Sequence, residues 1–130
     1  MRPIVLFAFF LLPHLWICAQ DQTDKLDTQL LVGSWELDMT PQDQTDNNFA
    51  MMEISKVDDN SFKGEFYRKG VPITNANINT QTGVIYGALV SGDGSGTYHT
   101  TFYAKDGILY GTTHALERNF LAVWTGRKLQ

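Results

Sequence analysis

Short runs of alternating polar and apolar residues, separated by turns rich in Gly, Asp and Asn, dominate this chain. The first run places Trp35, Leu37 and Met39 on one side of a strand and Ser34, Glu36 and Asp38 on the other. A period of two is the signature of a strand that is half buried and half in water. The same pattern predicts eight strands, over residues 34–39, 49–57, 61–68, 73–79, 84–90, 97–104, 108–114 and 120–127.

Short connections between these runs indicate how the strands pair. Asp106-Gly107 lies between two β-like runs and is among the stronger short-range signals for a hairpin. Strands joined by short links usually pair with their chain neighbours, so we expect an all-β, antiparallel, up-and-down meander. A meander of about eight strands can close into a barrel and so remove its exposed edges. A two-sheet sandwich is the alternative, but it needs at least one long return connection that the chain does not offer.

The N-terminal residues 1–19 have the parts of a secretion signal. Arg2 supplies a positive charge, residues 4–12 form an apolar run too short to span a bilayer comfortably, and Ala19 is a small residue before the expected cut. We expect a secreted or periplasmic protein that starts at Gln20, with a flexible lead-in over residues 20–30 and one barrel domain over 31–130. The alternatives are a lipid anchor on Cys18 and an uncleaved N-terminal anchor.

The charge balance limits the classes of partner. The formal net charge is −4, and loss of Arg2 with the signal would leave −5. The chain has no basic stripe, which argues against a nucleic-acid partner. The single cysteine would leave with the signal, so the mature chain would have no disulfide, no thiol nucleophile and no cysteine ligand for a metal. We expect no membrane contact unless Cys18 is lipidated, and the sequence leaves the oligomeric state open.

Gly33-Ser34-Trp35 resembles the Gly-x-Trp of the first strand in lipocalins and their relatives, the calycin-like barrels that include avidins. In lipocalins a basic residue near the end of the last strand packs on that tryptophan. The resemblance therefore implies a barrel-closing group of Gly33, Trp35 and Arg127, with Trp124 nearby. The amino-acid sequence after the second predicted strand also resembles small exported bacterial domains of unassigned function, and this resemblance implies no activity.

The aromatic residues give two hypotheses for the interior. Rings in a small barrel either fill it or line a pocket for one ligand. The leading hypothesis is non-catalytic binding of a small, partly apolar ligand inside the barrel, with residues 40–48 as a mobile rim. Its walls would be Trp35, Phe62, Phe66, Phe102 and Trp124. Strand residues such as Gly64, Gly87 and Gly111 would leave room either for that ligand or for neighbouring rings.

The alternative function is a filled barrel that acts through its outer surface as a protein-interaction or cell-envelope module. Its exposed contacts would be Tyr67, His99, Tyr103, Tyr110 and His114. A two-residue turn at Asp106-Gly107 would place His99 opposite His114 and Tyr103 opposite Tyr110, whereas a three-residue turn would shift this register by one. Two facing histidines could bind zinc or copper. No third ligand lies nearby in the sequence, so we expect no metal site.

Catalytic signatures are missing from the sequence. The serines lie in strands or turns without a nucleophile elbow, and residues 92–96 lack the lysine and the helix of a phosphate-binding loop. Asp93 in this segment does not follow the ligand spacing of a calcium loop. We therefore expect neither an enzyme nor a cofactor.

Overall fold

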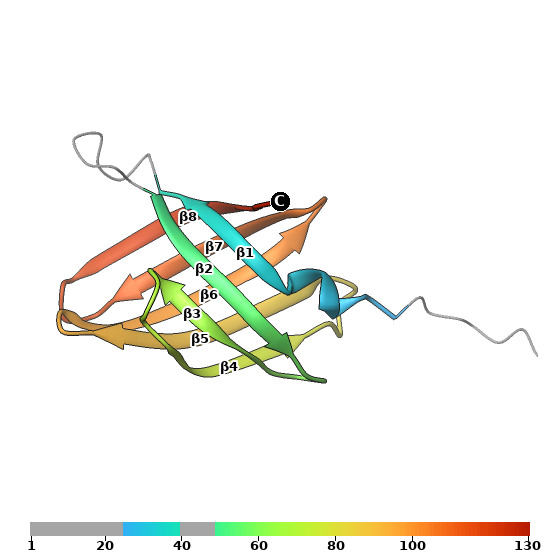
Figure 1. Ribbon diagram of the computed structural model, residues 1–130, viewed down its shortest axis with the longest axis horizontal. Coiled ribbons are helices and arrows are strands. Elements are labelled where there is room, and N and C mark those ends of the chain that lie inside the picture. The colour runs from blue at the N-terminus through green and yellow to red at the C-terminus, as the bar shows by residue number, and fades with distance from the viewer. Residues whose placement is uncertain (1–24, 40–48) are drawn as a thin grey trace, which may run out of the picture.

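The computed structural model describes residues 25–39 and 49–130. The predicted signal segment, Cys18 and the proposed rim loop of residues 40–48 lie outside these described residues. The described chain wraps eight antiparallel strands into a barrel (Figure 1). The strands are β1 Gly33–Asp38, β2 Phe49–Val57, β3 Phe62–Tyr67, β4 Ile73–Asn79, β5 Ile85–Asp93, β6 Gly96–Lys105, β7 Ile108–Ala115 and β8 Phe120–Lys128. No helix in the described part is long and apolar enough to cross a membrane.

The strand order confirms the predicted meander. It runs β3-β2-β1-β8-β7-β6-β5-β4, so every chain neighbour except β3 and β4 pairs, and the first strand also pairs with the last. The β3–β4 seam is not sealed by a ladder. It is bridged at Glu65↔Pro72 and by a hydrogen bond from Ile78 N to Asn60 O (2.9 Å). The barrel is therefore nearly closed.

The two hairpins β5–β6 and β6–β7 have two-residue turns. Asp106 and Gly107 both have positive φ, 53° and 77°, which is the backbone conformation that this short turn requires. Lys105 pairs with Ile108, so of the two registers that the sequence left open, the structure has the one with a two-residue turn. The β5–β6 turn is shorter than the Gly-rich sequence suggested, because Asp93 still pairs with Gly96.

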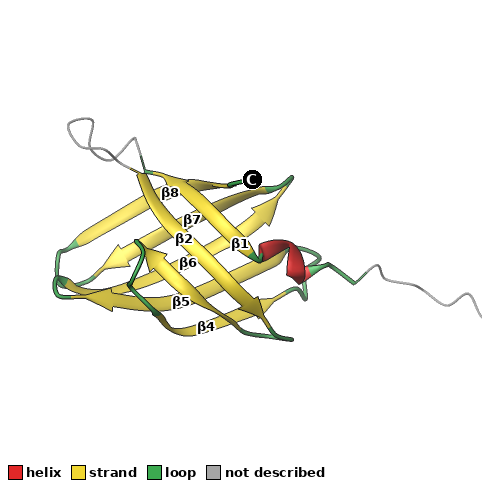
Figure 2. Ribbon diagram, in the orientation of Figure 1, coloured by secondary structure: helices red, strands yellow, loops and turns green. Residues whose placement is uncertain are grey.

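One end of the barrel carries a short 3₁₀ helix, η1 (Thr28–Leu31), the red element of Figure 2. Leu31 is 1% exposed and belongs to the core, and Gln29 Nε2 donates a hydrogen bond to Val57 O at 3.0 Å. Residues 28–30 of the predicted lead-in thus belong to this helix. The buried side chain of Leu31 anchors this segment to the barrel.

The core occupies the barrel interior. Trp35, Leu37 and Met39 are buried, as their alternation predicted. The same alternation continues along β5 to β8, where every second side chain enters the core and the others point outward. The outward positions of these four strands form the surface described next.

Candidate functional site

The outer face of β5–β8 carries no Asp, Glu, Lys or Arg over three successive rows. Each strand contributes three outward positions, so the face has twelve residues. Strand pairing aligns them into a tyrosine row (Tyr86, Tyr103, Tyr110, Thr125), a threonine row (Ala88, Thr101, Thr112, Val123) and a histidine row (Val90, His99, His114, Leu121). We call this surface the uncharged face.

The outward side chains of β1–β3 are different in kind. Glu36, Glu53, Lys56, Lys63 and Glu65 all lie there, and each is exposed or half-buried. Charged residues are the usual occupants of solvated positions. Strands β1–β3 thus form a charged side, whereas the exposed residues of β4, next to the uncharged face, are polar and uncharged.

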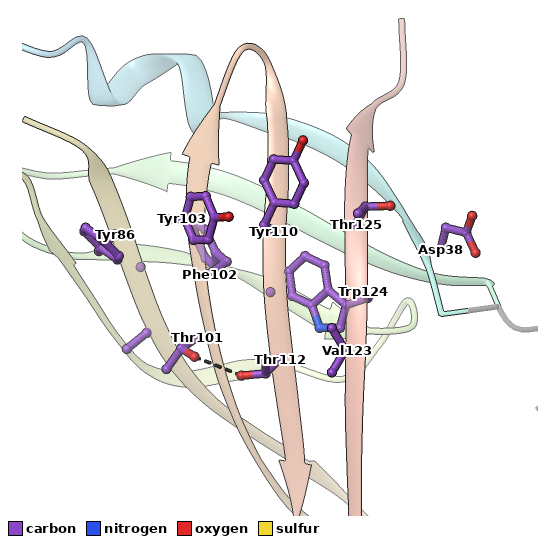
Figure 3. Close-up of a pocket in the computed structure, with 13 residues that line it drawn as sticks. Asp38, Tyr86, Thr101, Phe102, Tyr103, Tyr110, Thr112, Val123, Trp124 and Thr125 are labelled. Carbon is purple, nitrogen blue, oxygen red and sulfur yellow. Dashed lines mark hydrogen bonds between the residues drawn. The ribbon is translucent and has the colours of Figure 1, made fainter. Parts of the chain in front are cut away.

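Three tyrosines form a ridge on the uncharged face. The rings of Tyr103 and Tyr110 are stacked, with centroids 5.2 Å apart and planes 16° apart, and Tyr86 tilts against Tyr103 at 6.0 Å. Figure 3 shows Tyr103 and Tyr110 projecting from neighbouring strands, with the smaller Thr125 and Val123 on the next strand. Because each stacked ring covers a face of the other, the pair presents ring edges and hydroxyl groups to the outside.

A groove of about 630 Å³ runs beside this ridge. The tyrosine and threonine rows line it, and the hydroxyls of Thr101 and Thr112 share a hydrogen bond of 3.1 Å within it. Gly87, Phe102, Gly111 and Trp124 also line it, and because side chains alternate along a strand, they do so from the backbone side. Asp38 on β1 lies at one end of the groove, paired with Thr125. The volume falls in the range of small-molecule sites, and the lining is mainly apolar.

The two histidines face each other, as they would with a two-residue turn, since His99 pairs with His114. Hydrogen bonds from the backbone N–H groups of Glu117 and Thr97 are the largest causes that lower the pKa of the Glu117 carboxyl, and the nearby His99 adds a smaller electrostatic contribution. Within residues 25–39 and 49–130, no three His, Cys, Asp or Glu side chains gather in a group that could hold a metal ion. The pair therefore adds two polar imidazole rings to the uncharged face.

Tyr67, the fifth predicted surface contact, lies apart from the other four. It belongs to β3 and its ring stacks on that of the buried Tyr98, with centroids 5.6 Å apart. Tyr86 takes its place in the tyrosine row, and sequence reasoning missed it. The signal was present, because shortening the β5–β6 turn to Gly94-Ser95 brings Tyr86 opposite Tyr103.

The five predicted ligand-binding residues are all buried, with exposed fractions of 4% or less. Four of them contact one another. Ring centroids are 6.0 Å apart for Phe62 and Phe102, 6.5 Å for Phe102 and Trp124, and 6.3 Å for Phe66 and Trp124. Trp35 lies at the η1 end, where its Nε1 donates a hydrogen bond to Leu31 O (2.8 Å).

The strand glycines make room for these rings. A Cβ atom on Gly87 would lie 2.2 Å from Cζ of Phe102, and one on Gly111 would lie 2.3 Å from Cζ2 of Trp124. A Cβ atom on Gly64 would lie 1.7 Å from the carbonyl oxygen of Glu53. The sequence left open whether these glycines make room for a ligand or for neighbouring rings. In the structure, the space beside them is occupied by neighbouring protein atoms.

The polar edge of Trp124 is also satisfied by the protein. Its Nε1 donates to Thr113 Oγ1 at 3.0 Å, and that hydroxyl shares a second hydrogen bond with Thr100 Oγ1 at 2.9 Å. All three residues are buried. A buried indole N–H that has a partner needs no ligand to complete it.

The barrel-closing group differs by one residue from the one that the resemblance implied. Lys128 Nζ, not Arg127, lies over the Trp35 ring, 5.7 Å from its centroid, and it also donates to Leu30 O at 2.9 Å. Arg127 pairs with Glu36 and is exposed, because side chains alternate along β8. Gly33 has a φ of 139°, a backbone conformation that favours glycine.

Asp93 is bound within its own turn. Its carboxylate accepts hydrogen bonds from the hydroxyl of Ser95, from the backbone N–H of Ser95 and from the hydroxyl of Tyr98, and it forms an ion pair with Arg68 at 3.0 Å. The Ser95 hydroxyl is the largest cause that lowers the pKa of this carboxyl from its usual 3.8. These contacts give Asp93 a role in holding the β5–β6 turn.

No family model, curated protein or solved structure matches this chain.

Proposed function

We propose that the protein is an exported, non-catalytic interaction module that binds its partner through the uncharged face of β5–β8. The observation that carries the proposal is the run of twelve outward positions without Asp, Glu, Lys or Arg, on a barrel whose β1–β3 side is charged. Large exposed side chains lie within it, among them Tyr86 (47% exposed), Val123 (52%) and Leu121 (55%). Large apolar side chains exposed side by side on a protein surface typically mark an interaction site.

Kinship with the calycin-like barrels is part of the proposal. Its support is the Gly33-Ser34-Trp35 motif at the start of β1, together with a basic side chain from the last strand over Trp35. Export is supported by the signal-like composition of residues 1–19. One fold can host several functions, so kinship alone does not choose between the barrel interior and its outer surface.

The filled interior favours the outer surface. A ligand bound among Phe62, Phe102 and Trp124 would have to displace rings that contact one another and occupy the space before Gly87 and Gly111. Interior binding of a small apolar ligand remains a prediction with its own test. A hydrophobic probe that enters the barrel would quench tryptophan fluorescence, whereas a probe confined to the outer face would leave the buried Trp35 unchanged.

Native mass spectrometry of the protein, isolated gently from its own source, tests the proposed function. We expect a reproducible additional mass that is lost on denaturation, either a ligand or a protein chain. Thr112→Arg places a charge on the groove floor and should abolish this mass. Thr82→Arg makes the same change at an exposed turn position outside the uncharged face and should retain it.

Two results would contradict the proposal: a wild-type chain that binds neither a ligand nor a protein chain, a second copy of itself included, or a partner that Thr112→Arg still binds. The same spectra report the start of the mature chain. A start at Gln20 supports export with cleavage, and a lipid mass on Cys18 would place the protein on a membrane.

A further inference from the structure

We infer that the partner of the uncharged face is a second copy of this chain, which packs against it face to face as a symmetric dimer. This inference rests on the proposed function and names the partner. Two properties of the described surface support it, its charge and its shape, and its size sets the expected strength of the dimer.

The absence of charged side chains from the uncharged face argues against most other partners. The face offers no lysine or arginine to a nucleic acid or an anionic lipid surface, and no charge pattern to a charged peptide. Two copies of a chain with net charge −4 repel each other. Contact through β1–β3 would bury charged side chains of both signs, among them Glu36, Glu53 and Lys56. Through the uncharged face, two like-charged barrels can meet without burying charged side chains.

The shape of the uncharged face is complementary to that of the same face on a second copy. The tyrosine row is a ridge, and the adjacent threonine row is the low floor of the groove. A two-fold axis that lies in the face, parallel to the rows and between these two, sets each ridge on the floor of the other copy. Strand β6 then lies over β6, so Tyr103 of each copy packs on Thr101 of the other, and on β7 Tyr110 packs on Thr112. Strands that run antiparallel across such a contact allow the aligned packing of two sheets.

The size of the face predicts a weak dimer. Four strands at about 4.8 Å spacing span about 19 Å, and the three uncharged rows at about 6.8 Å span about 20 Å. Because the outer wall of a barrel is convex, the footprint is at most roughly 400 Å² per copy and about 800 Å² for the pair, which is below the usual size of a stable specific interface. We therefore expect reversible association that depends on concentration.

Sedimentation velocity of the purified mature chain, from about 1 μM to about 1 mM, tests the dimer in the range where an interface of this size dissociates. We expect the wild-type chain to shift from monomer to dimer. Thr101→Glu and Tyr103→Arg each leave a charge buried against an uncharged group, so each variant alone should associate at least about tenfold more weakly. Thr82→Glu adds the same charge outside the face and should associate as the wild type does.

Mixing the two variants tests the geometry. In the mixed dimer, the carboxylate that Thr101→Glu introduces on one copy would face the guanidinium that Tyr103→Arg introduces on the other, while the symmetry-related contact stays native. The mixture should therefore recover association near the wild-type level. Thr112→Glu mixed with Tyr110→Arg repeats the test on β7 if a β6 variant does not fold, and thermal melting of each variant reports folding.

Three results would overturn the inference: a wild-type chain that is monomeric throughout, a dimer that Thr101→Glu leaves unchanged, or a mixture that recovers nothing. A monomeric chain does not overturn the proposed function. In that case native mass spectrometry would still show a foreign ligand or protein that Thr112→Arg releases.

Discussion

Replacing Gly111 with alanine tests whether the barrel interior is filled, on which the proposed function depends. The new Cβ atom would lie 2.3 Å from Cζ2 and 2.5 Å from Cη2 of Trp124. Carbon atoms in contact are about 3.5–4.0 Å apart, so an indole that is 2% exposed has to move by more than about 1 Å. Gly111 does not have positive φ, so backbone strain adds nothing to the cost.

The magnitude follows from two opposing effects. Overpacking a closed core costs about 1–3 kcal/mol, and the short distance places this site at the upper end. Alanine recovers about 0.5–1 kcal/mol relative to glycine within a strand. The free energy of unfolding should therefore fall by about 2 kcal/mol, which corresponds to a Tm lower by roughly 8–16 °C for a domain of this size.

Thermal unfolding followed by circular dichroism measures this change, with Gly94→Ala as the matched control. A Cβ atom on Gly94 would meet nothing within 4 Å, so this variant should stay within about 0.5 kcal/mol of the wild type. Adding Trp124→Phe to Gly111→Ala should cost less than the sum of the two single changes, because the smaller ring leaves room for the methyl group. A Gly111→Ala protein as stable as the wild type would refute the reasoning and return the interior ligand to first place.

Three further changes test other contacts. Thr113→Val leaves the indole N–H of Trp124 buried without a partner and should lower the unfolding free energy by about 1–3 kcal/mol in urea titration; Thr112→Val, at an outward position, is its control. Lys128→Met removes the charge over Trp35 and should cost less than about 1 kcal/mol, measured by melting with Arg127→Met as the neutral comparison. Asp93→Asn removes the stabilisation that goes with a lowered carboxyl pKa, which is fully present above the usual value of 3.8 and is lost as the pH falls through the lower folded value. The difference in Tm between wild type and Asp93→Asn should therefore be present at neutral pH and should become smaller as the pH falls below 3.8.

The strand pattern was readable from the sequence because each element carries its own local signal. Alternation placed Trp35 and Leu37 inside, and Asp106-Gly107 predicted the β6–β7 hairpin, while the turn length, and with it the pairing of His99 with His114, was left open. These signals act over short stretches of chain and do not depend on the rest of the fold. The β5–β6 hairpin was less clear, because several glycines close together allow more than one turn length, and the bonds that Asp93 makes to Ser95 and Tyr98 select one of them.

What the sequence could not supply was the contact between distant positions. The basic residue over Trp35 is Lys128 rather than Arg127, and a shift of one residue reverses which face of the strand a side chain occupies. In the same way, Gly111 and Trp124 are paired only across β7 and β8, so no local pattern could show that the ring fills the space before the glycine. The strand glycines suggested space for a ligand, but the paired strands place aromatic rings in that space.

The uncharged face could be predicted only in part from the sequence, because it too depends on the strand register. Along any one strand, Tyr86, Thr101 or Val123 is an ordinary outward residue, and a single exposed apolar side chain indicates nothing. The face exists because four strands place their uncharged positions in the same three rows. Solvent does not require this arrangement, since the outward positions of β1–β3 carry charges on the same barrel. A surface that lacks charge and is not needed for the core is best explained by what it contacts, and in the proposed dimer the tyrosine ridge of each copy lies on the threonine floor of the other.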